Sequence, residues 1–394
     1  MKVDTDPQKI NEVLTRGVEC IYPSPEALKS VLAGGRKLRI YLGIDPTGKL
    51  HIGHLAGLRK LRQLQDLGHE IIVLLGDFTA TIGDPTDKTA TRQPLTREEV
   101  RKNEKGYKKQ IGKILDLTKA NVRFFSNEKW TNKLKPKDML ELASRFTVAR
   151  LLERDMFQER IKAGKDIRVH EFLYPIFQAY DGVTMDVDME IGGNDQTFNM
   201  LAGRDLMRTM KNKEKFVLAT RLLVDPSGKK MGKTEGNMVN LDESPNEMFG
   251  KIMSWPDGLV AMGLELLTNV SQGGIEEIKK LNPREAKVRL AKEIVATCHS
   301  QELASLAEKE FNRVFQKKEQ PTKIPKISLR EKELSLVELI VKTKLASSKS
   351  EARRLVLQKG IKIDGKVQSD PAEIIVIKKG TVIQAGPRRF VRMQ

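Results

Sequence analysis

One stretch near the N-terminus constrains the fold more than any other, because elements of different periodicity follow one another there. Residues 38–43 form a short, mostly apolar, β-prone run that ends at glycine, and residues 45–48 are typical of a tight turn. Leucines then recur every three positions over 55–67 among polar and basic residues, which predicts a helix with one apolar face. Residues 71–75 are apolar throughout, as in a strand buried on both faces. The stretch therefore predicts a strand–helix–strand unit of a parallel, doubly wound sheet.

A later part of the chain repeats this order. Residues 183–191 are expected to form a strand, which a glycine-rich loop at 192–196 connects to a helix that runs to about residue 210. Between these two parts, residues 96–163 have charged helical sequence and are expected to form a helical insertion between the halves of the sheet. The predicted fold class is α/β, with a Rossmann-like parallel-sheet domain, an α-helical domain and a small α+β C-terminal domain.

Composition shifts divide the rest of the chain. Residues 244–315 are again helical in pattern, whereas residues 316–327 contain two prolines and four lysines, as in a linker. We therefore expect a catalytic domain, an α-helical domain, a linker and a C-terminal domain, at residues 1–243, 244–315, 316–330 and 331–394.

The chain is strongly basic, with a net charge of +18. Such a charge favours a polyanionic partner, which could be RNA, DNA or an anionic membrane face, although a solvated lysine-rich surface is the simpler alternative. Fourteen Lys and Arg oppose seven Asp and Glu in residues 331–394, so the basic excess lies where a nucleic-acid module is expected.

Other sequence features exclude a membrane protein and a disulfide-rich secreted one. We find no apolar run of the ~20 residues that a bilayer span requires, and the N-terminus lacks the pattern of a secretory signal. Only Cys20 and Cys298 are present, too few for a disulfide framework or a cysteine-rich zinc site. A cytoplasmic location with no membrane partner is expected.

The first candidate site is the run His51-Ile52-Gly53-His54, where the predicted turn passes into the helix. The free backbone N–H groups and the dipole of a helix N-terminus attract phosphate, and Gly53 leaves room for a nucleotide. An isolated His-x-x-His is more often structural, and a metal site ranks behind both readings because no cysteine or carboxylate lies beside the pair at ligand spacing. No metal ligands are predicted.

The second candidate element is the segment 225–237, which carries three lysines within five residues among glycines and a proline. Lysines on a closing loop can neutralise the charge that develops on a polyphosphate. Alone such a loop is usually solvated surface. It becomes evidence for a nucleotide site only in combination with the histidine pair upstream.

Together these elements resemble the HIGH and KMSKS signatures of the class I aminoacyl-tRNA synthetases. The first matches fully, and the second, Lys230-Met231-Gly232-Lys233-Thr234, departs at Gly232 and Thr234. The resemblance implies that ATP is a substrate, accompanied by Mg2+, and that its phosphates contact His51, His54, Lys230 and Lys233. Thr234 keeps the hydroxyl of the motif and is counted with these catalytic residues.

Four further motifs resemble the tyrosyl branch of this family and occur in the same order. They are Tyr41-Leu42-Gly43-Ile44-Asp45-Pro46-Thr47, Ile82-Gly83-Asp84-Pro85, Tyr174-Pro175-Ile176-Phe177-Gln178-Ala179-Tyr180-Asp181 and Gly192-Gly193-Asn194-Asp195-Gln196. By this resemblance Tyr41 and Asp181 bond the phenol of a tyrosine substrate. Tyr174, Gln178 and Asp84 are expected to bind the ammonium group of the tyrosine, and Gln196 is also assigned to the tyrosine site. The ribose of ATP and the adenylate are assigned to Gly43, Asp45, Gly53, Gly192 and Asp195. Arg92 is assigned, more loosely, to pyrophosphate or to the tRNA acceptor end.

A buried donor–acceptor pair aimed at a phenolic hydroxyl is left unpaired by phenylalanine, and the tyrosyl enzymes are a known example of such discrimination. The implied reaction has two steps. The tyrosine carboxylate attacks the α-phosphate of ATP and expels pyrophosphate, and the adenylate then passes its acyl group to the 3′ end of tRNA(Tyr).

The C-terminal residues 335–367 are similar to the alpha-L RNA-binding fold, with two short helices and a strand that turns at Asp364-Gly365. This resemblance implies RNA contacts by Lys349, Arg353 and Arg354, and the family implies a homodimer. Three rivals remain: a tryptophanyl synthetase, a noncatalytic RNA-binding protein on a synthetase scaffold, and a small-molecule nucleotidyltransferase.

Overall fold

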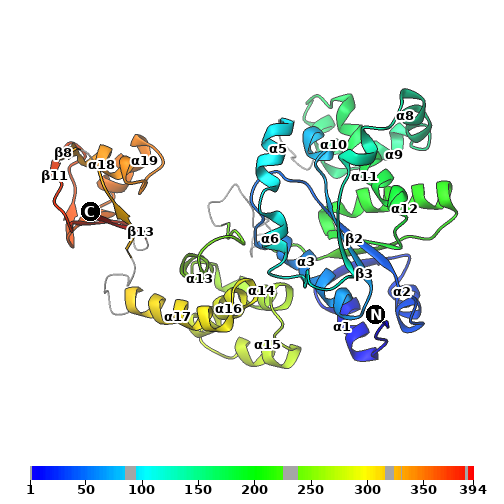
Figure 1. The fold of residues 1–394 in the computed structure, drawn as a ribbon, viewed down its shortest axis with the longest axis horizontal. Helices are drawn as coiled ribbons and strands as arrows, with labels where there is room; N and C mark the ends of the chain where they lie inside the picture. Colours follow the sequence, from blue (N-terminus) through cyan, green and yellow to red (C-terminus); the bar gives the residue numbers. More distant parts are fainter. Residues whose placement is uncertain (1, 85–94, 225–237, 316–323, 330, 387–388) are drawn as a thin grey trace. The chain divides into compact units, whose positions relative to one another are not determined.

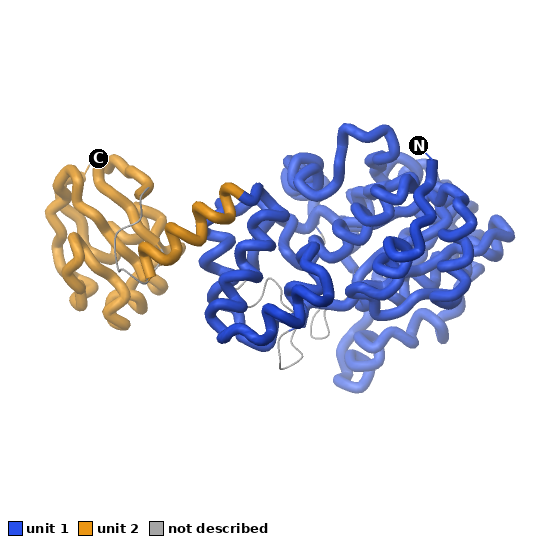
Figure 2. The backbone as a smooth tube through the Cα atoms, turned by 90° about the horizontal axis from the view of Figure 1, so that it is seen from below, with its two compact units in different colours: residues 1–301 blue, residues 302–394 orange. Residues whose placement is uncertain are grey.

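The structure is a computed structural model that describes residues 2–84, 95–224, 238–315, 324–329, 331–386 and 389–394. The chain divides into two compact units, Met1–Gln301 and Glu302–Gln394, which Figure 2 draws in different colours. None of the helices in the described residues is long and apolar enough to cross a membrane.

A six-stranded sheet forms the centre of the first unit (Figure 1). Its strands lie in the order β1-β6-β5-β2-β3-β4. β1 runs antiparallel to β6, and the other neighbours are parallel. The order places β2 beside β5, so the two predicted strand–loop–helix segments meet at the middle of the sheet. The strands are β1 (Val18–Tyr22), β2 (Arg39–Ile44), β3 (Glu70–Leu75), β4 (Val122–Ser126), β5 (Met189–Gly193) and β6 (Phe216–Thr220).

Helices cover both faces of this sheet. They are α1 (Pro7–Thr15), α2 (Pro25–Ala33), α3 (Ile52–Asp66), α4 (Thr79–Ile82), α5 (Arg97–Glu104), α6 (Tyr107–Ile111), α7 (Glu128–Thr131), α8 (Pro136–Ala143), α9 (Val148–Leu152), α10 (Asp155–Lys162), α11 (Val169–Thr184) and α12 (Thr197–Lys211), with a 3-10 turn, η1 (Asn194–Gln196), before α12.

Alternation along β2 decides which side chains face which layer. Tyr41 packs with residues of β3, α11 and α12 in one buried cluster, whereas Leu42 points the other way, toward α3. A Cβ at Gly57 of α3 would lie 3.3 Å from Leu42 Cδ2, so the glycine lets the helix approach the strand closely. The predicted unit over residues 38–75 is confirmed by β2, α3 and β3, which are joined in parallel register.

Two expectations for the sheet were wrong. The strand expected over 183–191 begins only at Met189, because Val183 and Thr184 close α11. The segment 96–163 is not wholly helical, since it contains β4, which pairs with β3 at the edge of the sheet. The β-prone run Val122-Arg123-Phe124-Phe125 gives this strand its local preference.

The helical part of the first unit follows the sheet in sequence. It contains α13 (Pro245–Met253), a 3-10 turn η3 (Asp257–Leu259), α14 (Val260–Leu267), α15 (Gln272–Lys279) and α16 (Pro283–Cys298).

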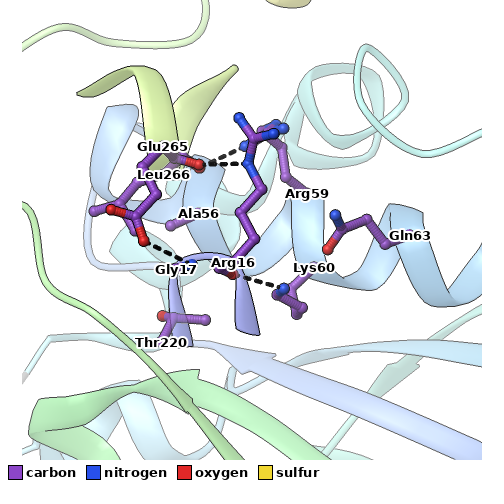
Figure 3. Close-up of a pocket in the computed structure, with 9 residues that line it drawn as sticks. All are labelled: Arg16, Gly17, Ala56, Arg59, Lys60, Gln63, Thr220, Glu265 and Leu266. Atoms are coloured by element: carbon purple, nitrogen blue, oxygen red, sulfur yellow. Dashed lines mark hydrogen bonds between the residues drawn. The ribbon is translucent and has the colours of Figure 1, made fainter. Parts of the chain in front are cut away.

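Two arginines hold α14 against the catalytic part, around the pocket in Figure 3. The Arg59 guanidinium donates to Leu266 O at 2.7 Å, to Thr268 O, and to Asn269 Oδ1 at 2.6 Å. Arg16 donates to Leu264 O at 3.0 Å, to Glu265 O at 2.9 Å and to Thr268 O at 2.6 Å. Both cations thus satisfy carbonyls that the end of α14 leaves free.

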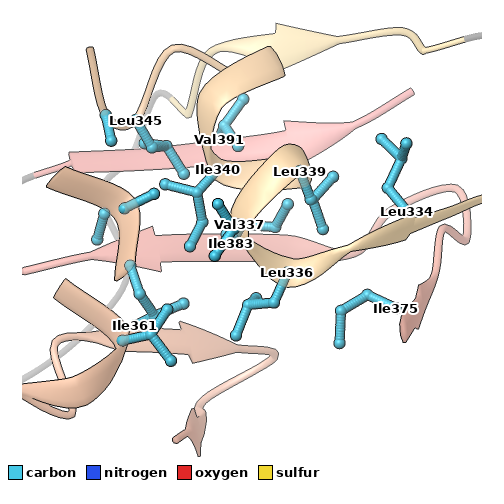
Figure 4. Close-up of a cluster of buried hydrophobic side chains, with 14 of the residues drawn as sticks. Leu334, Leu336, Val337, Leu339, Ile340, Leu345, Ile361, Ile375, Ile383 and Val391 are labelled. Atoms are coloured by element: carbon cyan, nitrogen blue, oxygen red, sulfur yellow. The ribbon is translucent and has the colours of Figure 1, made fainter. Parts of the chain in front are cut away.

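The second unit has its own core, shown in Figure 4. It contains α17 (Gln301–Phe315) except for the first residue of that helix, which belongs to the first unit. Its other elements are β7 (Lys326–Ile327), β8 (Glu333–Ser335), α18 (Leu336–Lys342), α19 (Lys349–Leu357), β9 (Ile361–Ile363), β10 (Lys366–Gln368), β11 (Ile374–Val376), β12 (Val382–Ala385) and β13 (Arg389–Met393).

The two helices and the hairpin expected in this unit are confirmed, with Asp364 and Gly365 at positive φ between β9 and β10, as a tight hairpin turn requires. β7 falls inside the residues expected to be a linker, yet it pairs in parallel with β13 and so belongs to the C-terminal sheet.

Candidate functional site

The candidate site lies where β2 and β5 end side by side. Open parallel sheets bind ligands at such a switch point, because the loops leaving the two strands diverge and expose a crevice. His51 and the start of α3 follow β2, and Gly192 and Gly193 close β5 before η1. Both loops that the sequence selected therefore serve the same edge.

The two histidines of the first motif cap α3 reciprocally. His51 Nδ1 accepts from Gly53 N at 3.1 Å, and His54 Nδ1 accepts from His51 N at 3.1 Å, with the ring centroids 4.1 Å apart. A Cβ at Gly53 would lie 2.9 Å from His51 Cε1, so only glycine leaves this ring its place. The motif is thus a helix N-terminus that presents two partly exposed imidazoles.

A second segment is joined to this motif by its backbone. Ile52 N donates to Val239 O and Leu241 N donates to Leu50 O, each at 2.9 Å, and His51 bridges to Asn240. Residues 239–241, which lie beside the histidines, follow the lysine-rich segment in sequence. Lys230, Lys233 and Thr234 lie outside the described residues, as does Arg92.

Asp45, just beyond the end of β2, is held by two hydroxyl donors. Thr79 Oγ1 donates to its Oδ1 at 2.7 Å, and the Tyr174 hydroxyl donates to its Oδ2 at 2.8 Å. Burial and the neighbouring Asp45 and Asp84 raise the pKa of Tyr174 well above its usual value, so the phenol keeps its proton. Nothing lies within 4 Å of a Cβ built at exposed Gly43, so the strand end stays open at that point.

Asp181 lies near the C-terminal end of α11, with only 2% of its surface exposed. Its Oδ1 accepts from Trp130 Nε1 at 2.7 Å, and its Oδ2 accepts from Asn127 Nδ2 at 3.1 Å. Burial raises the pKa of Asp181 to about 8 although both N–H groups favour the ionised form.

Tyr41 is completely buried, and its hydroxyl has no hydrogen-bond partner among the described residues. Burial, Glu190 and Asp181 raise the pKa of Tyr41 well above its usual value, so the hydroxyl remains a donor. Buried polar groups in folded proteins are nearly always paired, so an orphaned hydroxyl marks a position that a ligand can complete.

Asp84 takes part in a buried ion pair. Its Oδ1 accepts from Arg154 Nη2 at 2.9 Å, with both side chains less than a tenth exposed, and its Oδ2 accepts from Gln196 Nε2 at 2.7 Å. Gln196 Oε1 in turn accepts from Asn199 Nδ2 at 3.0 Å. Each carboxylate oxygen retains a further lone pair for another donor.

The other predicted residues surround this network. Gln178 is half-buried on α11 and donates from Nε2 to Glu190 Oε1 at 3.0 Å. Gly192 is buried, and Asp195 is exposed on η1.

Hydrogen bonds link part of the sequence-predicted set. Tyr174 is joined to Asp45, and Gln196 to Asp84, while Asn127 Nδ2 bridges Asp181 to Thr79 Oγ1 at 3.1 Å. Sequence reasoning missed the partners Thr79, Asn127, Trp130, Arg154, Glu190 and Lys215. They lie outside the residues singled out in the motifs, and the only hint was Trp130, one of two tryptophans in the chain.

The C-terminal candidates belong to the second unit. Lys349 and Arg353 stand one turn apart on the exposed face of α19, with Arg354 exposed beside them. Lys349 Nζ lies 3.4 Å from Glu338 Oε1, a solvent-exposed pair that a phosphate could displace at little cost.

Two family models match the chain. The model described as tRNA synthetases class I (W and Y) matches residues 33–316, and the model for the tyrosine–tRNA ligase SYY-like C-terminal domain matches residues 316–385.

Curated relatives match over nearly the whole length. A tyrosine–tRNA ligase of Moorella thermoacetica is 43% identical, covering 100% of this chain and 97% of the relative. One from Thermotoga maritima is 42% identical, with 98% of each chain covered.

Solved structures agree in fold. A C-terminally truncated mitochondrial tyrosyl-tRNA synthetase of Coccidioides posadasii superposes with a TM-score of 0.62 at 25% identity, covering 76% of this chain and 91% of that one. A tyrosyl-tRNA synthetase of Archaeoglobus fulgidus complexed with L-tyrosine gives a TM-score of 0.60 at 23% identity, covering 77% of this chain and 100% of that one.

Proposed function

This chain belongs to the class I tRNA synthetases of the tryptophan and tyrosine family, and we propose how its described residues perform tyrosine–tRNA ligation. The reaction joins tyrosine to tRNA(Tyr) at the expense of ATP. Within the site, the choice of tyrosine as substrate rests on one pair of buried groups. They are the Tyr41 hydroxyl, which has no hydrogen-bond partner among the described residues, and the Asp181 carboxyl, which two N–H donors hold.

In the proposed complex the substrate phenol completes this pair. It accepts from the Tyr41 hydroxyl and donates to the Asp181 carboxylate, so its single oxygen satisfies both. Phenylalanine would leave the Tyr41 hydroxyl unpaired and would offer Asp181 no donor beyond Trp130 and Asn127, at a cost of several kcal/mol. An indole offers only a donor, which leaves Tyr41 without an acceptor.

The ammonium group of the substrate is assigned to acceptors on the opposite side of the pocket. Asp84 supplies a carboxylate in a partly desolvated setting, where a charge-assisted hydrogen bond is strong. Tyr174 and Gln178 offer the oxygens of a hydroxyl and an amide, and Gln196 is held against Asp84.

ATP is proposed to lie across the ends of β2 and β5. His51 and His54 would stabilise its phosphates at the N-terminus of α3, where Gly53 has no side chain to block the nucleotide. Asp45, Gly43, Gly192 and Asp195 are assigned to the ribose and the adenylate, because carboxylates at strand ends suit ribose hydroxyls.

Lys230, Lys233 and Thr234 are assigned to the phosphates from the opposite side. The backbone bonds of Val239 and Leu241 to the histidine segment support this assignment, since they hold residues that follow the lysine-rich segment in sequence next to α3. No protein nucleophile is needed, because the tyrosine carboxylate itself attacks the α-phosphate, and positioning with charge stabilisation supplies the rate.

Mg2+ is proposed as a companion of the ATP phosphates. Within the described residues no group of three or more His, Cys, Asp or Glu is placed to hold a metal. Mg2+ is commonly bound through substrate phosphates and water with few protein ligands.

The test is amino-acid-dependent exchange of pyrophosphate into ATP. We expect exchange with tyrosine and none above background with tryptophan or phenylalanine. Exchange with tryptophan in place of tyrosine would assign the chain to the other branch of its family, and exchange with neither would leave a noncatalytic RNA-binding protein.

The second unit is proposed to bind tRNA through Lys349, Arg353 and Arg354. Their exposure on one helix of a basic domain supports this, and such phosphate contacts are salt-sensitive. Deleting residues 331–394 should leave tyrosine-dependent exchange nearly intact and weaken tRNA charging, whereas equal loss of both would contradict an RNA-binding role. Domain limits at 243, 315 and 330 stay predictions.

A homodimer is proposed on four large apolar side chains that are exposed on α8, α9, α10 and α11. Leu140, Val148, Ile161 and Val169 expose 73%, 67%, 49% and 77% of their surface there. Such side chains gather at interfaces between subunits. A Val169→Lys variant should sediment as a monomer, and an unchanged dimer would place the interface elsewhere.

We also propose a cytoplasmic location, which the two free cysteines support.

A further inference from the structure

Lys215 and Glu190 form a buried ion pair beside Tyr41 and Gln178, two residues of the proposed tyrosine site. Lys215 Nζ donates to Glu190 Oε2, and the two side chains are 0% and 2% exposed. Glu190 is on β5, and Lys215 immediately precedes β6. A pair this deeply buried is a poor source of stability, because the cost of desolvating both charges offsets their attraction.

The surrounding helices are shaped around this pair. A Cβ at Gly203 of α12 would lie 2.5 Å from Lys215 Nζ, and one at Gly182 of α11 would lie 3.6 Å from the same nitrogen. The Gly182 position is also 3.7 Å from the Tyr41 hydroxyl, and Lys215 Nζ lies 5.9 Å from the centroid of the Tyr41 ring. The two glycines thus leave room for the ammonium group of Lys215 beside Tyr41, the tyrosine proposed to bind the substrate.

The second oxygen of Glu190 faces the pocket residue Gln178. Gln178 Nε2 donates to Glu190 Oε1 at 3.0 Å. An amide presents a donor end and an acceptor end of nearly the same shape, whereas an ionised carboxylate only accepts. Glu190 therefore binds the NH2 end, and the carbonyl oxygen of Gln178 is directed away from it. A substrate ammonium group has only donors and needs that oxygen.

We infer that the Lys215–Glu190 pair is a positioning device that fixes the amide of Gln178 with its oxygen toward the substrate ammonium group. Lys215 supplies the counter-charge that keeps Glu190 an acceptor, and neither residue touches the substrate. The inference rests on the proposed tyrosine site. It adds two residues outside the motifs to those that determine recognition of the amino acid.

The decisive variant is Glu190→Gln combined with Lys215→Met, which removes both charges and leaves no buried charge unpaired. The new amide at position 190 can donate as well as accept, so it no longer dictates the orientation of Gln178. We expect the KM for tyrosine in pyrophosphate exchange to rise about tenfold, as for the loss of one hydrogen bond to a charged group. The KM for ATP should stay within about twofold of the wild-type value.

Two competitive inhibitors separate recognition of the ammonium group from general damage. Tyramine has the phenol and the ammonium group, whereas 3-(4-hydroxyphenyl)propionate has the phenol without it. Glu190 also acts on the Tyr41 hydroxyl, and any effect through that hydroxyl is common to both phenols. The double variant should therefore weaken tyramine about tenfold more than 3-(4-hydroxyphenyl)propionate. Equal weakening of both inhibitors, or of neither, would overturn the inference.

A matched control exists in another buried pair. Arg160 and Glu171 join α10 to α11 and are 1% and 3% exposed. Neutralising them by Arg160→Met with Glu171→Gln should change thermal stability to a similar extent while the KM for tyrosine stays at the wild-type value. A tyrosine effect of equal size in this control would also refute the inference. Wild-type protein without tyrosine-dependent exchange would instead refute the proposed function.

Discussion

Replacing Trp130 with phenylalanine removes one N–H donor from Asp181 and leaves an aromatic ring in place. The indole Nε1 lies 2.7 Å from Asp181 Oδ1, and the ring packs edge-on to Phe125 at 6.4 Å between centroids. Phenylalanine retains much of this contact. The substitution therefore acts chiefly on the charge of the carboxyl that is proposed to accept the substrate phenol.

The size of the effect follows from the pKa of Asp181, which is about 8. A hydrogen bond to a charged group is worth about 1.5–3 kcal/mol and one to a neutral group about half as much, so its loss raises the pKa by about one unit. The ionised form accepts the phenol proton in a charge-assisted hydrogen bond, which is about twice as strong as the bond to a neutral carboxyl, and tyrosine binding is expected to follow this form. The fraction of Asp181 that is ionised should therefore fall about ninefold at pH 7 and about threefold at pH 8.5.

The assay is the KM for tyrosine in pyrophosphate exchange between pH 6.5 and 8.5. In the wild type this KM should fall as pH rises toward and through about 8, because Asp181 loses its proton. The ratio of variant to wild-type KM should be about nine at pH 7 and about three at pH 8.5, with the KM for ATP unchanged. A ratio that is independent of pH, or equal to one, would refute the reasoning.

Trp255→Phe is the control for this substitution. Trp255 is 2% exposed, and its indole nitrogen has no hydrogen-bond partner among the described residues. It should alter stability without any pH-dependent change in the KM for tyrosine.

Two further predictions concern residues outside the tyrosine pocket. Arg59→Met keeps the apolar stem but removes the donor to Leu266 O, whereas Thr268 O still accepts from Arg16. The free energy of unfolding in urea should therefore fall by about 1–3 kcal/mol, and an unchanged value would show that water replaces the guanidinium. Gly76→Ala would place a Cβ 2.0 Å from Asp45 Oδ1 and 2.5 Å from Thr79 Oγ1. Because Asp45 is assigned to the ATP ribose, the KM for ATP should rise about tenfold. The control is Gly273→Ala, whose new Cβ would have nothing within 4 Å and should leave the KM for ATP unchanged.

Local sequence patterns predicted the elements whose periodicity is strong and unbroken. β2, α3 and β3 follow from alternation, leucine spacing and the turn at 45–48, all of which act between near neighbours. β4 was missed because its five residues lie among charged helical segments, and it is a strand only where β3 offers a parallel partner. The start of β5 was misplaced because residues 183 and 184 extend α11, which packs on α12.

The sequence by itself determined the loops that carry the chemistry, since a histidine pair at a helix N-terminus and a glycine-rich loop after a strand are recognisable from adjacent residues. It did not determine their partners. Asp181 meets Trp130 across 51 positions and Asp84 meets Arg154 across 70, so these contacts exist only once the chain between β3 and β5 has folded back on itself. The charge of Asp181 depends on burial, and the amide of Gln178 depends on Glu190, and both are properties of the packed interior. Folding alone brings these groups together, because hydrogen bonds and desolvation act over a few ångströms in space, whatever the separation along the chain.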